Sequence, residues 1–492
     1  MEKGKWAVET SSSGKLGDAM RKDKGRVLFL YPVTEGDGGI PNGMALLSGT
    51  LKNSGFETAC FDTTFLYSPP KTHLYRQKHG GIMAADHQRF WGEWDPSIPG
   101  TIPRLFLDKI KKFEPDLIAV SIVDVSYNYA ISLIAEIKKT VNIPVVAGGV
   151  TVSMCPDMVI KNDCIDIICI GEGEDPIVEL AEAIVLKKNY NNIKNLWIKN
   201  GSEIIKNPLR ELRNMDTLAF QDWSIFDERH YYKPYCGSFY RTGFFELARG
   251  CHFNCSFCCT ASYRNLFHGL GKFVRTRSID KAFDEIEYVR DNYNLELIFF
   301  IDDNFLGMPK ERFDYFCQQY KKRINLPFYI QTRSEVVTEE YVKKLKQINI
   351  STIAIGIEHG DESLRKKMNR HMSNDNLKRA FDIVHKYEIR STANIIIGMP
   401  YEEETMFKET IKLLQEIKPK SISINYFQPY RGTLMREQAV KLGYISEDHI
   451  ITDSNVSIDM PLFKKDRQVH FYENFRRYVD GELGFKDSGN GN

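Results

Sequence analysis

The chain has no excess of charge of either sign, since 66 Lys and Arg are offset by 65 Asp and Glu in 492 residues. A near-neutral protein has no overall basic field that would draw it to nucleic acid or to an anionic membrane. It also lacks any window approaching 18 consecutive apolar residues, and its first 25 residues lack the apolar core of a signal peptide. We therefore expect a cytoplasmic protein with no membrane span and no nucleic-acid partner.

Cysteine is scarce too, with ten residues, but four of them fall within nine positions of the stretch ARGCHFNCSFCC at 248–259. In a reducing compartment such a cluster indicates metal binding or catalysis and not a disulfide framework. A structural zinc site takes four ligands, commonly as two spaced pairs or as a pair with histidines, and no second pair follows here. Cys251, Cys255 and Cys258, in the spacing C-x3-C-x2-C, instead fit an iron-sulfur cluster with one iron left open.

The first part of the chain alternates short β-branched runs with helical stretches. The runs that we expect to be strands lie at 27–32, 56–62, 117–123, 145–149 and 165–174. Strands separated by helices form parallel βαβ units, so 26–190 is predicted to be a doubly wound, Rossmann-like α/β domain behind a disordered segment at 1–25. Residues 64–105 break the rhythm and read as an insertion, a lid or a partner-contacting segment.

The second part repeats the alternation. Residues 191–243 read as a linker with a hairpin at Asn200-Gly201. From 244 to 445 six expected strands alternate with helices, which predicts a partial (βα)6 TIM-like barrel, and 446–492 reads as a short helical tail. Every expected barrel strand ends in polar residues or glycine, and ligands bind at the carboxyl ends of parallel strands. The chemistry is therefore expected at those strand ends.

The cysteine loop resembles that of the radical S-adenosylmethionine (SAM) superfamily, in its spacing, in Phe257 directly before the third cysteine, and in its place after the first barrel strand. The resemblance implies that the three cysteines hold a 4Fe-4S cluster whose open iron binds SAM, with Phe257 in the SAM site. A ferredoxin or flavodoxin would then supply the electron that cleaves SAM to a 5'-deoxyadenosyl radical. Cys259 lies outside the motif and is expected to be a buried or spare thiol and not a fourth ligand.

Further stretches carry the same resemblance. It implies SAM contacts for Arg333 in QTRSE, Glu358 in GIEHGD and Gly398 in IIIGMP. His359 departs from the family pattern, which has serine at this position. The alternative for Arg333 and Glu358 is a structural ion pair in the barrel mouth. For the substrate, the resemblance and the strand ends together point to Asp302, Tyr426, Tyr430 and Arg431.

The first domain resembles the cobalamin-binding domain that precedes the barrel in a large class of these enzymes. Its glycine-rich stretch 36–43 lacks the G-x-G-x-x-G spacing of a dinucleotide site. The expected cobalamin contacts lie at three strand ends, where bare glycines let a macrocycle approach the backbone: Ser121, Val123, Gly148, Gly149, Val150, Gly171, Glu172, Gly173 and Glu174. The alternative is ordinary tight turns. Because the motif D-x-H-x-x-G is missing, the resemblance implies cobalamin bound with its own base displaced and no protein histidine below the cobalt.

The two resemblances together imply a cobalamin-dependent C-methyltransferase. In that class one SAM methylates the reduced cobalamin, and a second supplies the radical that activates an unreactive carbon of a small molecule or of a protein or peptide side chain. An alternative within the class is a cyclase, rearrangement or oxygen-insertion enzyme that transfers no methyl group. A different class would be an iron-sulfur sensor or binding module. A zinc-bearing nucleic-acid protein is disfavoured, since neither a basic patch nor a second ligand pair is present.

Overall fold

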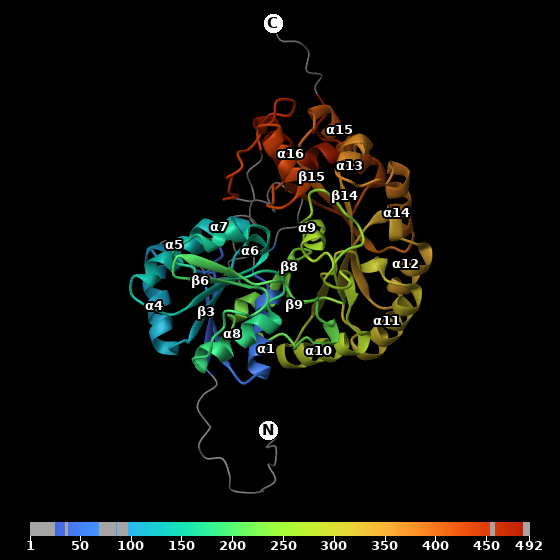
Figure 1. Ribbon diagram of the computed structural model, residues 1–492. Coiled ribbons are helices and arrows are strands. Elements are labelled where there is room, and N and C mark those ends of the chain that lie inside the picture. The colour runs from blue at the N-terminus through green and yellow to red at the C-terminus, as the bar shows by residue number, and fades with distance from the viewer. Residues whose placement is uncertain (1–24, 35–37, 68–84, 86–96, 453–457, 486–492) are drawn as a thin grey trace.

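The computed structural model describes residues 25–34, 38–67, 85, 97–452 and 458–485. Two α/β units lie side by side, the first coloured blue to green and the second green to red (Figure 1). Each is built on a seven-stranded sheet, and the two sheets share no strand. A doubly wound domain followed by a partial barrel is the predicted fold class, which is confirmed. The predicted disordered segment and most of the predicted insertion lie outside the described residues.

The first sheet is parallel over five strands in the order β2-β1-β3-β4-β5. The strands are β1 (Arg26–Tyr31), β2 (Glu57–Asp62), β3 (Leu117–Ser121), β4 (Val145–Gly148) and β5 (Ile167–Cys169). One face is covered by α1 (Asn42–Asn53) and α8 (Glu174–Val185). The other is covered by α4 (Ile102–Phe113), α5 (Tyr127–Lys138), α6 (Val150–Met154) and α7 (Pro156–Ile160). The strand order reverses between β1 and β3, and such a switch point opens a crevice for a ligand at the carboxyl ends.

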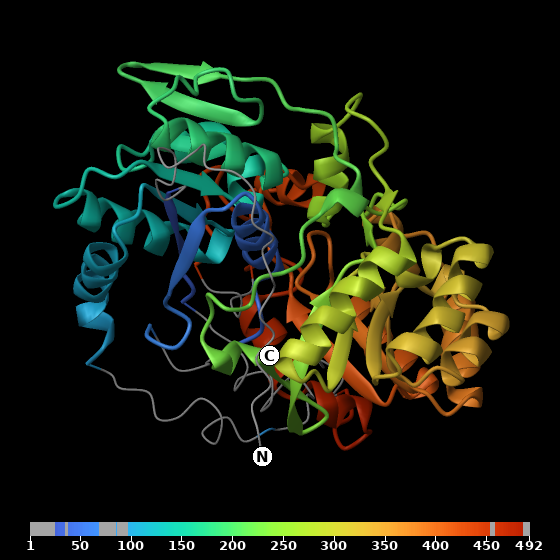
Figure 2. The ribbon, with the colours of Figure 1, turned by 90° about the horizontal axis from the view of Figure 1, so that it is seen from below.

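The predicted hairpin forms, but it belongs to the first sheet. Strands β6 (Leu196–Asn200) and β7 (Glu203–Lys206) pair antiparallel around Gly201, whose φ is 63°, and β6 pairs with β5. In Figure 2 this hairpin is the green pair at the edge of the first domain. The first sheet therefore extends past residue 190 to 206. The crossing segment then contains the short turns η3 (Met215–Thr217) and η4 (Glu228–Tyr231).

The second sheet has the order β16-β15-β14-β13-β12-β9-β8. Its six parallel strands are β9 (Ser238–Phe245), β12 (Leu297–Phe300), β13 (Phe328–Thr332), β14 (Ile350–Glu358), β15 (Arg390–Ile397) and β16 (Ser421–Tyr426), and β8 (Tyr232–Tyr235) is antiparallel. The helices between them are α10 (Ile279–Tyr293), α11 (Lys310–Arg323), α12 (Glu339–Lys346), α13 (Glu362–Lys367), α14 (Asn374–Lys386) and α15 (Glu404–Ile417). Consecutive parallel strands place all six carboxyl ends on one side of the sheet.

Short elements complete the second unit. After β9 come β10 (Ala248–Arg249), the cysteine loop, α9 (Cys259–Leu266) and β11 (Arg275–Thr276). After β16 come α16 (Leu434–Lys441), α17 (Lys465–Glu473) and α18 (Phe475–Val479), and α18 packs against α15. Within the described ranges, no helix is both long enough and apolar enough to span a bilayer.

The apolar core is continuous across the two units. A single cluster of buried side chains runs from Phe29 and Leu180 in the first domain, through Trp223 in the crossing segment, to Phe245 and Ile298 in the barrel. Domains joined only by a polar contact move relative to one another, whereas a large apolar interface fixes them. The continuous core therefore holds the strand ends of the two sheets in one arrangement.

Candidate functional site

Two cavities open where the strand ends of the two units meet. The smaller, at the mouth of the barrel, has a volume of about 150 Å³. Its lining includes all three cysteines of the motif, Cys251, Cys255 and Cys258, together with Phe257. Cys259 is instead the first residue of α9. The structure thus brings together the three predicted ligands and leaves the fourth cysteine of the loop outside this lining.

Buried arginines surround one of the three cysteines. Arg333 donates from Nη1 to the sulfur of Cys255 at 3.0 Å, and Arg370 donates from Nη1 to the same atom at 3.5 Å. Arg333 is also paired with Glu335 and lies 3.7 Å from the ring of Phe253. The Nε of Arg370 is buried and has no hydrogen-bond partner among the described residues. A buried N–H without a partner, on a residue that lines the cavity, makes Arg370 a candidate donor to a ligand.

The donor set fits a cluster better than a single ion. In the described part of the chain, no three His, Cys, Asp or Glu side chains converge closely enough to hold one metal ion. A 4Fe-4S cluster needs a different arrangement, because each thiolate binds a different iron. Three cysteines spread around a cavity that also contains arginine donors meet that need.

Glu358 is directed into the smaller cavity by its backbone. The register of β14 and β15 shifts between Gly356 and Glu358, and Glu358 has a φ of 65°, a conformation that non-glycine residues adopt at a cost. Its carboxylate lies 3.7 Å from Arg370. Burial raises the pKa of Glu358 above its ordinary value, although the guanidinium groups of Arg370 and Arg333 oppose this. The predicted SAM contacts Arg333 and Glu358 therefore share one cavity with the cysteines.

His359 has a structural partner that explains its departure from serine. Its Nδ1 accepts the N–H of Asp361 at 3.0 Å, so its Nε2 carries the proton and donates to Glu402 at 3.1 Å. Glu402 in turn accepts the backbone N–H groups of Gly398 and Met399 at 2.6 and 2.8 Å. His359 thus holds the turn after β15 in place through Glu402.

Gly398, predicted to approach SAM, contacts the C-terminal segment. Its φ is 87°, and a Cβ there would lie 2.4 Å from Oε1 of Gln468. Gln468 comes from α17 and is fully buried. A side chain at Gly398 would therefore push aside the side-chain amide of Gln468 and would be strained by the positive φ.

The larger cavity, about 390 Å³, lies between the first domain and the cysteine loop. Seven of the nine predicted cobalamin contacts line it: Ser121, Gly148, Gly149, Gly171, Glu172, Gly173 and Glu174. Val123 is 41 % exposed, and Val150 begins α6. A Cβ on Gly148 would come no nearer than 4.0 Å to another residue, whereas one on Gly149 would lie 2.6 Å from the carbonyl oxygen of Ile122. Gly148 therefore leaves room for a ligand, and Gly149 is required by the turn.

The inner part of the larger cavity is an apolar slot. Side chains of the sheet and of helices α1 and α8 line it: Phe29, Met44, Leu47, Val146, Ile177 and Leu180. A slot with these walls fits the displaced aromatic base of cobalamin. His230, the histidine near the loop after β1, is buried and engaged, with Nδ1 on the carbonyl of Gly39 and Nε2 on Asp62. The residues present fit the form of cobalamin that the sequence implied.

The two cavities share part of their walls. Thr260 and Asp303 line both of them. The hydroxyl of Thr260 donates to the carboxylate of Asp303 at 3.3 Å. Burial raises the pKa of Asp303, and the bond from Thr260 opposes this. A molecule that reaches from one cavity to the other passes this pair.

The predicted substrate residues are dispersed. Asp302 is buried and accepts the N–H of Leu247 at 3.1 Å, so its neighbour Asp303 is the one that lines the cavities. Tyr426 is buried against Tyr472, with ring centroids 4.5 Å apart. Tyr430 is 39 % exposed. Arg431 donates to the carbonyl oxygens of Asp448 and His449 and lines a separate pocket with Cys155.

Several residues of the site were not predicted. They are Arg249, Thr260, Tyr263, Phe267 and Arg275 around the larger cavity, and Phe253, Arg370 and Asn394 around the smaller. Arg370 illustrates the reason. It ends a run in which Lys366 and Lys367 are exposed while Arg365 and Arg370 are buried. Charged residues of this kind read as a solvated surface, and only the packing of α13 on the cysteine loop distinguishes them.

Comparison with known proteins agrees with both units. The family model of the B12 binding domain matches residues 100–181, and that of the Radical SAM superfamily matches residues 245–414. The chain is 25 % identical over 338 residues to an uncharacterised methyltransferase of Pyrococcus horikoshii, covering 67 % of this chain and 71 % of the relative. It is 24 % identical over 338 residues to the anaerobic magnesium-protoporphyrin IX monomethyl ester cyclase of Cereibacter sphaeroides, covering 66 % and 53 %, so it spans about half the length of that cyclase.

Among solved structures, the chain resembles the radical S-adenosylmethionine methyltransferase TsrM from Kitasatospora setae. The TM-score is 0.64 at 16 % identity, covering 94 % of this chain and 84 % of that chain, which shows the shared fold. A B12-binding domain ahead of a radical SAM barrel defines a class of enzymes that use both cofactors. This chain combines the two domains, and its cofactors are a 4Fe-4S cluster, SAM and cobalamin.

Proposed function

We propose that this chain is a C-methyltransferase that acts on an unactivated carbon of a small molecule or of a protein or peptide side chain. The observation that carries the proposal is the wall that the two cavities share at Thr260 and Asp303. When bound, cobalamin supplies a transferable methyl group, and the cluster with SAM supplies a 5'-deoxyadenosyl radical. A substrate carbon at the shared wall is within reach of both, with no need for a domain to move.

The residues of the smaller cavity bind and orient SAM in this proposal. The 4Fe-4S cluster is held by Cys251, Cys255 and Cys258. Arg370, with its unused N–H, offers a donor to a carboxylate, and Glu358 offers an acceptor to an ammonium or a ribose hydroxyl. Arg333 is already paired with Glu335, so its role is to donate to Cys255.

The larger cavity binds cobalamin with its base in the apolar slot. Gly148 leaves room for the macrocycle, and Ser121 at the end of β3 offers a hydroxyl to its amide side chains. His230 is held by Asp62 and Gly39, so it would not be available as a ligand to the bound cofactor.

The remaining parts of the proposal concern partners. A low-potential electron carrier such as a ferredoxin or flavodoxin supplies the electron, and the cytoplasm is the compartment. A sensor with a fully ligated cluster is disfavoured because Cys259, the nearest further thiol in sequence, begins α9 and does not line the cluster cavity.

The test uses the holoenzyme, reconstituted without oxygen with iron, sulfide and hydroxocobalamin. It is incubated with SAM carrying a trideuteriomethyl group, flavodoxin and its reductase, and a metabolite and peptide extract. The expected result is 5'-deoxyadenosine, S-adenosylhomocysteine and an extract component that gains the label at carbon, none of which the Cys258→Ala variant forms.

The similarity to an ester cyclase gives the second candidate, ring closure or oxygen insertion without methyl transfer. It predicts 5'-deoxyadenosine with no labelled product and incorporation of oxygen from labelled water. Failure of the holoenzyme to retain cobalamin would contradict both candidates.

A further inference from the structure

The strand end Gly171-Glu172-Gly173-Glu174 contacts the barrel as well as the larger cavity. A Cβ on Gly171, whose φ is 81°, would lie 2.4 Å from the ring of Phe267 in the segment after the cysteine loop. Glu172 and Glu174 are paired with arginines that flank the same loop. The bare glycine and the two carboxylates therefore face residues of the other domain.

The carboxylate of Glu172 is fully engaged by these arginines. Its Oε1 accepts Nη1 of Arg249 at 3.0 Å and Nη2 of Arg275 at 2.6 Å, and its Oε2 accepts Nη1 of Arg275 at 3.0 Å. Arg249 also donates from Nη1 to Glu174 at 2.8 Å and from Nε to Glu246 of the barrel at 2.8 Å. Bidentate pairs of this kind fix geometry as well as adding energy.

These ions are shielded from solvent. The side chains of Glu172 and Arg249 are each 18 % exposed, that of Arg275 is 12 % and that of Glu174 is 7 %. Burial alone would raise the pKa of Glu172, but the guanidinium groups of Arg275 and Arg249 outweigh it and hold the pKa below its ordinary value. Removing one partner of such a pair leaves a buried charge uncompensated, which makes the contact selective for its own partners.

The position of Arg249 gives the pairing a consequence for the cofactors. Arg249 lies two residues before Cys251, on the strand β10 that pairs with β11, where Arg275 lies. The pairing thus ties the strand end that lines the cobalamin cavity to both sides of the loop that carries the cluster cysteines. We propose that Glu172 and Glu174 are positioning residues that fix the cluster loop relative to bound cobalamin, through Arg249 and Arg275.

This inference rests on the proposed function, because a fixed spacing matters only where both cofactors act on one substrate carbon. It also changes the role of the two glutamates, which were predicted as cobalamin contacts. With both oxygens of Glu172 occupied by guanidinium groups, the amide groups of cobalamin would have to compete with two charged donors. Joining the domains is the role that its contacts support.

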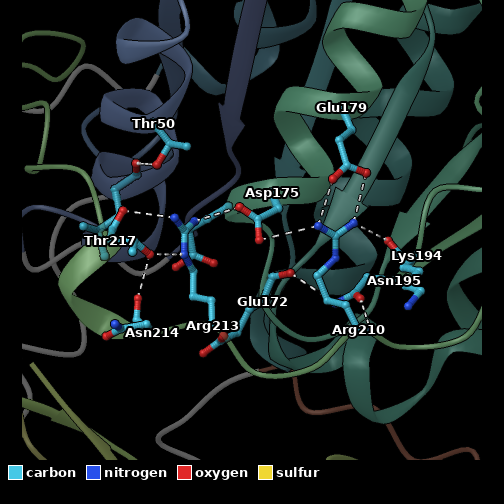
Figure 3. A network of polar contacts seen from close by, with 12 residues as sticks. Thr50, Glu172, Asp175, Glu179, Lys194, Asn195, Arg210, Arg213, Asn214 and Thr217 are labelled. Atoms are coloured by element: carbon cyan, nitrogen blue, oxygen red, sulfur yellow. Dashed lines mark hydrogen bonds and ion pairs between the residues drawn. The ribbon is translucent and has the colours of Figure 1, made fainter. Parts of the chain in front are cut away.

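A second set of ion pairs, in which the carboxylates are exposed, provides a control. In Figure 3, Arg210 and Arg213 of the crossing segment reach Asp175 and Glu179 at the start of α8. The side chain of Glu179 is 48 % exposed, and its partner Arg210 is on the crossing segment and not on the barrel. Exposed pairs contribute little, so Glu179→Gln should leave the relation of the two cofactors unchanged.

The experiment measures the relation of the cofactors directly and needs no substrate. Holoenzyme is prepared with cob(II)alamin and with the cluster reduced, so that both centres carry an unpaired electron. The magnetic coupling between them is then recorded by electron paramagnetic resonance. Wild type and Glu179→Gln are expected to give one well-defined coupling, whereas Glu172→Gln is expected to give a weaker and broader one.

A second readout is the rate at which cobalamin leaves each variant, followed by its visible spectrum after gel filtration. Glu172→Gln is expected to lose cobalamin about tenfold faster than Glu179→Gln, equivalent to about 1.4 kcal/mol of lost interaction. Arg275→Lys keeps the charge but not the bidentate geometry, and its rate of cobalamin loss is expected to lie between those of Glu172→Gln and Glu179→Gln. It also keeps the test decisive if Glu172→Gln fails to fold.

The outcomes separate the inference from the function on which it rests. If wild type shows the coupling and both Glu172→Gln and Arg275→Lys match Glu179→Gln in coupling and in cobalamin retention, the positioning role is refuted. If wild type itself binds no cobalamin, the proposed function fails instead. Loss of cobalamin from Glu172→Gln with an unchanged coupling in the fraction that retains it would show a cofactor contact and no positioning, and would also overturn the inference.

Discussion

Replacing Glu402 by alanine should destabilise the turn after β15 and weaken SAM binding. Glu402 is 1 % exposed, and its carboxylate accepts three buried donors, the N–H groups of Gly398 and Met399 and the Nε2 of His359. A buried donor left without a partner costs about 1–3 kcal/mol, so three would cost about 3–9 kcal/mol if nothing relaxed. Water can enter the space left by the side chain. We therefore expect a loss of about 4 kcal/mol, in the lower part of that range.

The assay is urea unfolding of the cofactor-free chain, followed by tryptophan fluorescence, since Trp223 is fully buried in the core shared by the two units. Glu402→Gln keeps an oxygen acceptor for the turn and should cost about 1–2 kcal/mol. Glu403→Ala is the matched control, because Glu403 makes no side-chain capping bond at the start of α15, and it should stay within about 0.5 kcal/mol of wild type.

A second measurement connects this network to the site. Binding of SAM to the reconstituted enzyme, measured by equilibrium dialysis, should weaken about tenfold in Glu402→Gln, since the turn carries the predicted contact Gly398. If Glu402→Ala is as stable as the control Glu403→Ala, the role of Glu402 in holding the turn is refuted. If Glu402→Ala and Glu402→Gln lose the expected stability but Glu402→Gln binds SAM as tightly as wild type, only the contact at Gly398 is refuted.

Three further predictions concern the pH, the cluster and its ligands. Burial raises the pKa of Asp302 to about 7, so between its unfolded value near 4 and pH 7 the folded state binds the extra proton and stability falls as pH rises. In urea titrations, wild type should lose about 2 kcal/mol more than Asp302→Asn between about pH 5 and pH 7. Parallel stability curves for the two proteins would contradict this. Arg370→Gln removes a positive donor from the sulfur of Cys255 and should lower the midpoint potential of the cluster by roughly 60 mV, the equivalent of about 1.4 kcal/mol for one electron. The assay is a potentiometric titration, and a potential equal to that of wild type would count against this role of Arg370. Cys259→Ala should keep the iron content and spectrum of wild type after reconstitution while Cys258→Ala loses them, and equal losses in both would make Cys259 a ligand.

The regular parts of the fold and the cluster ligands follow from local patterns. The six barrel strands and the five parallel strands of the first sheet were predicted from β-branched runs separated by helical stretches. The three cysteines are recognisable because their spacing within one loop is itself the signal. The hairpin at Gly201 was predicted as well, but its membership of the first sheet was not, because pairing with β5 is a contact between distant strands.

The rest of the site depends on pairings across long stretches of sequence. Glu172 meets Arg275 from 103 residues away, and Arg333 meets Cys255 from 78 residues away. No periodicity within one segment encodes such a pair. Gly398 shows the same limit in another form, since its positive φ was compatible with a cofactor contact, but the atom that a side chain would meet belongs to Gln468 in the C-terminal segment.

The continuous apolar core has a consequence for how this enzyme can be taken apart. The helices α1 and α8, which cover the first sheet, belong to the same buried cluster as the barrel, and Trp223 of the crossing segment lies within it. A chain cut at residue 206 would expose that face to water on both fragments. The two units should therefore unfold in one transition, and a cobalamin-binding module excised or exchanged at the linker should be insoluble unless residues on α1, α8 and the crossing segment are redesigned together. Although the two units bind different cofactors, they are not expected to fold as separate domains.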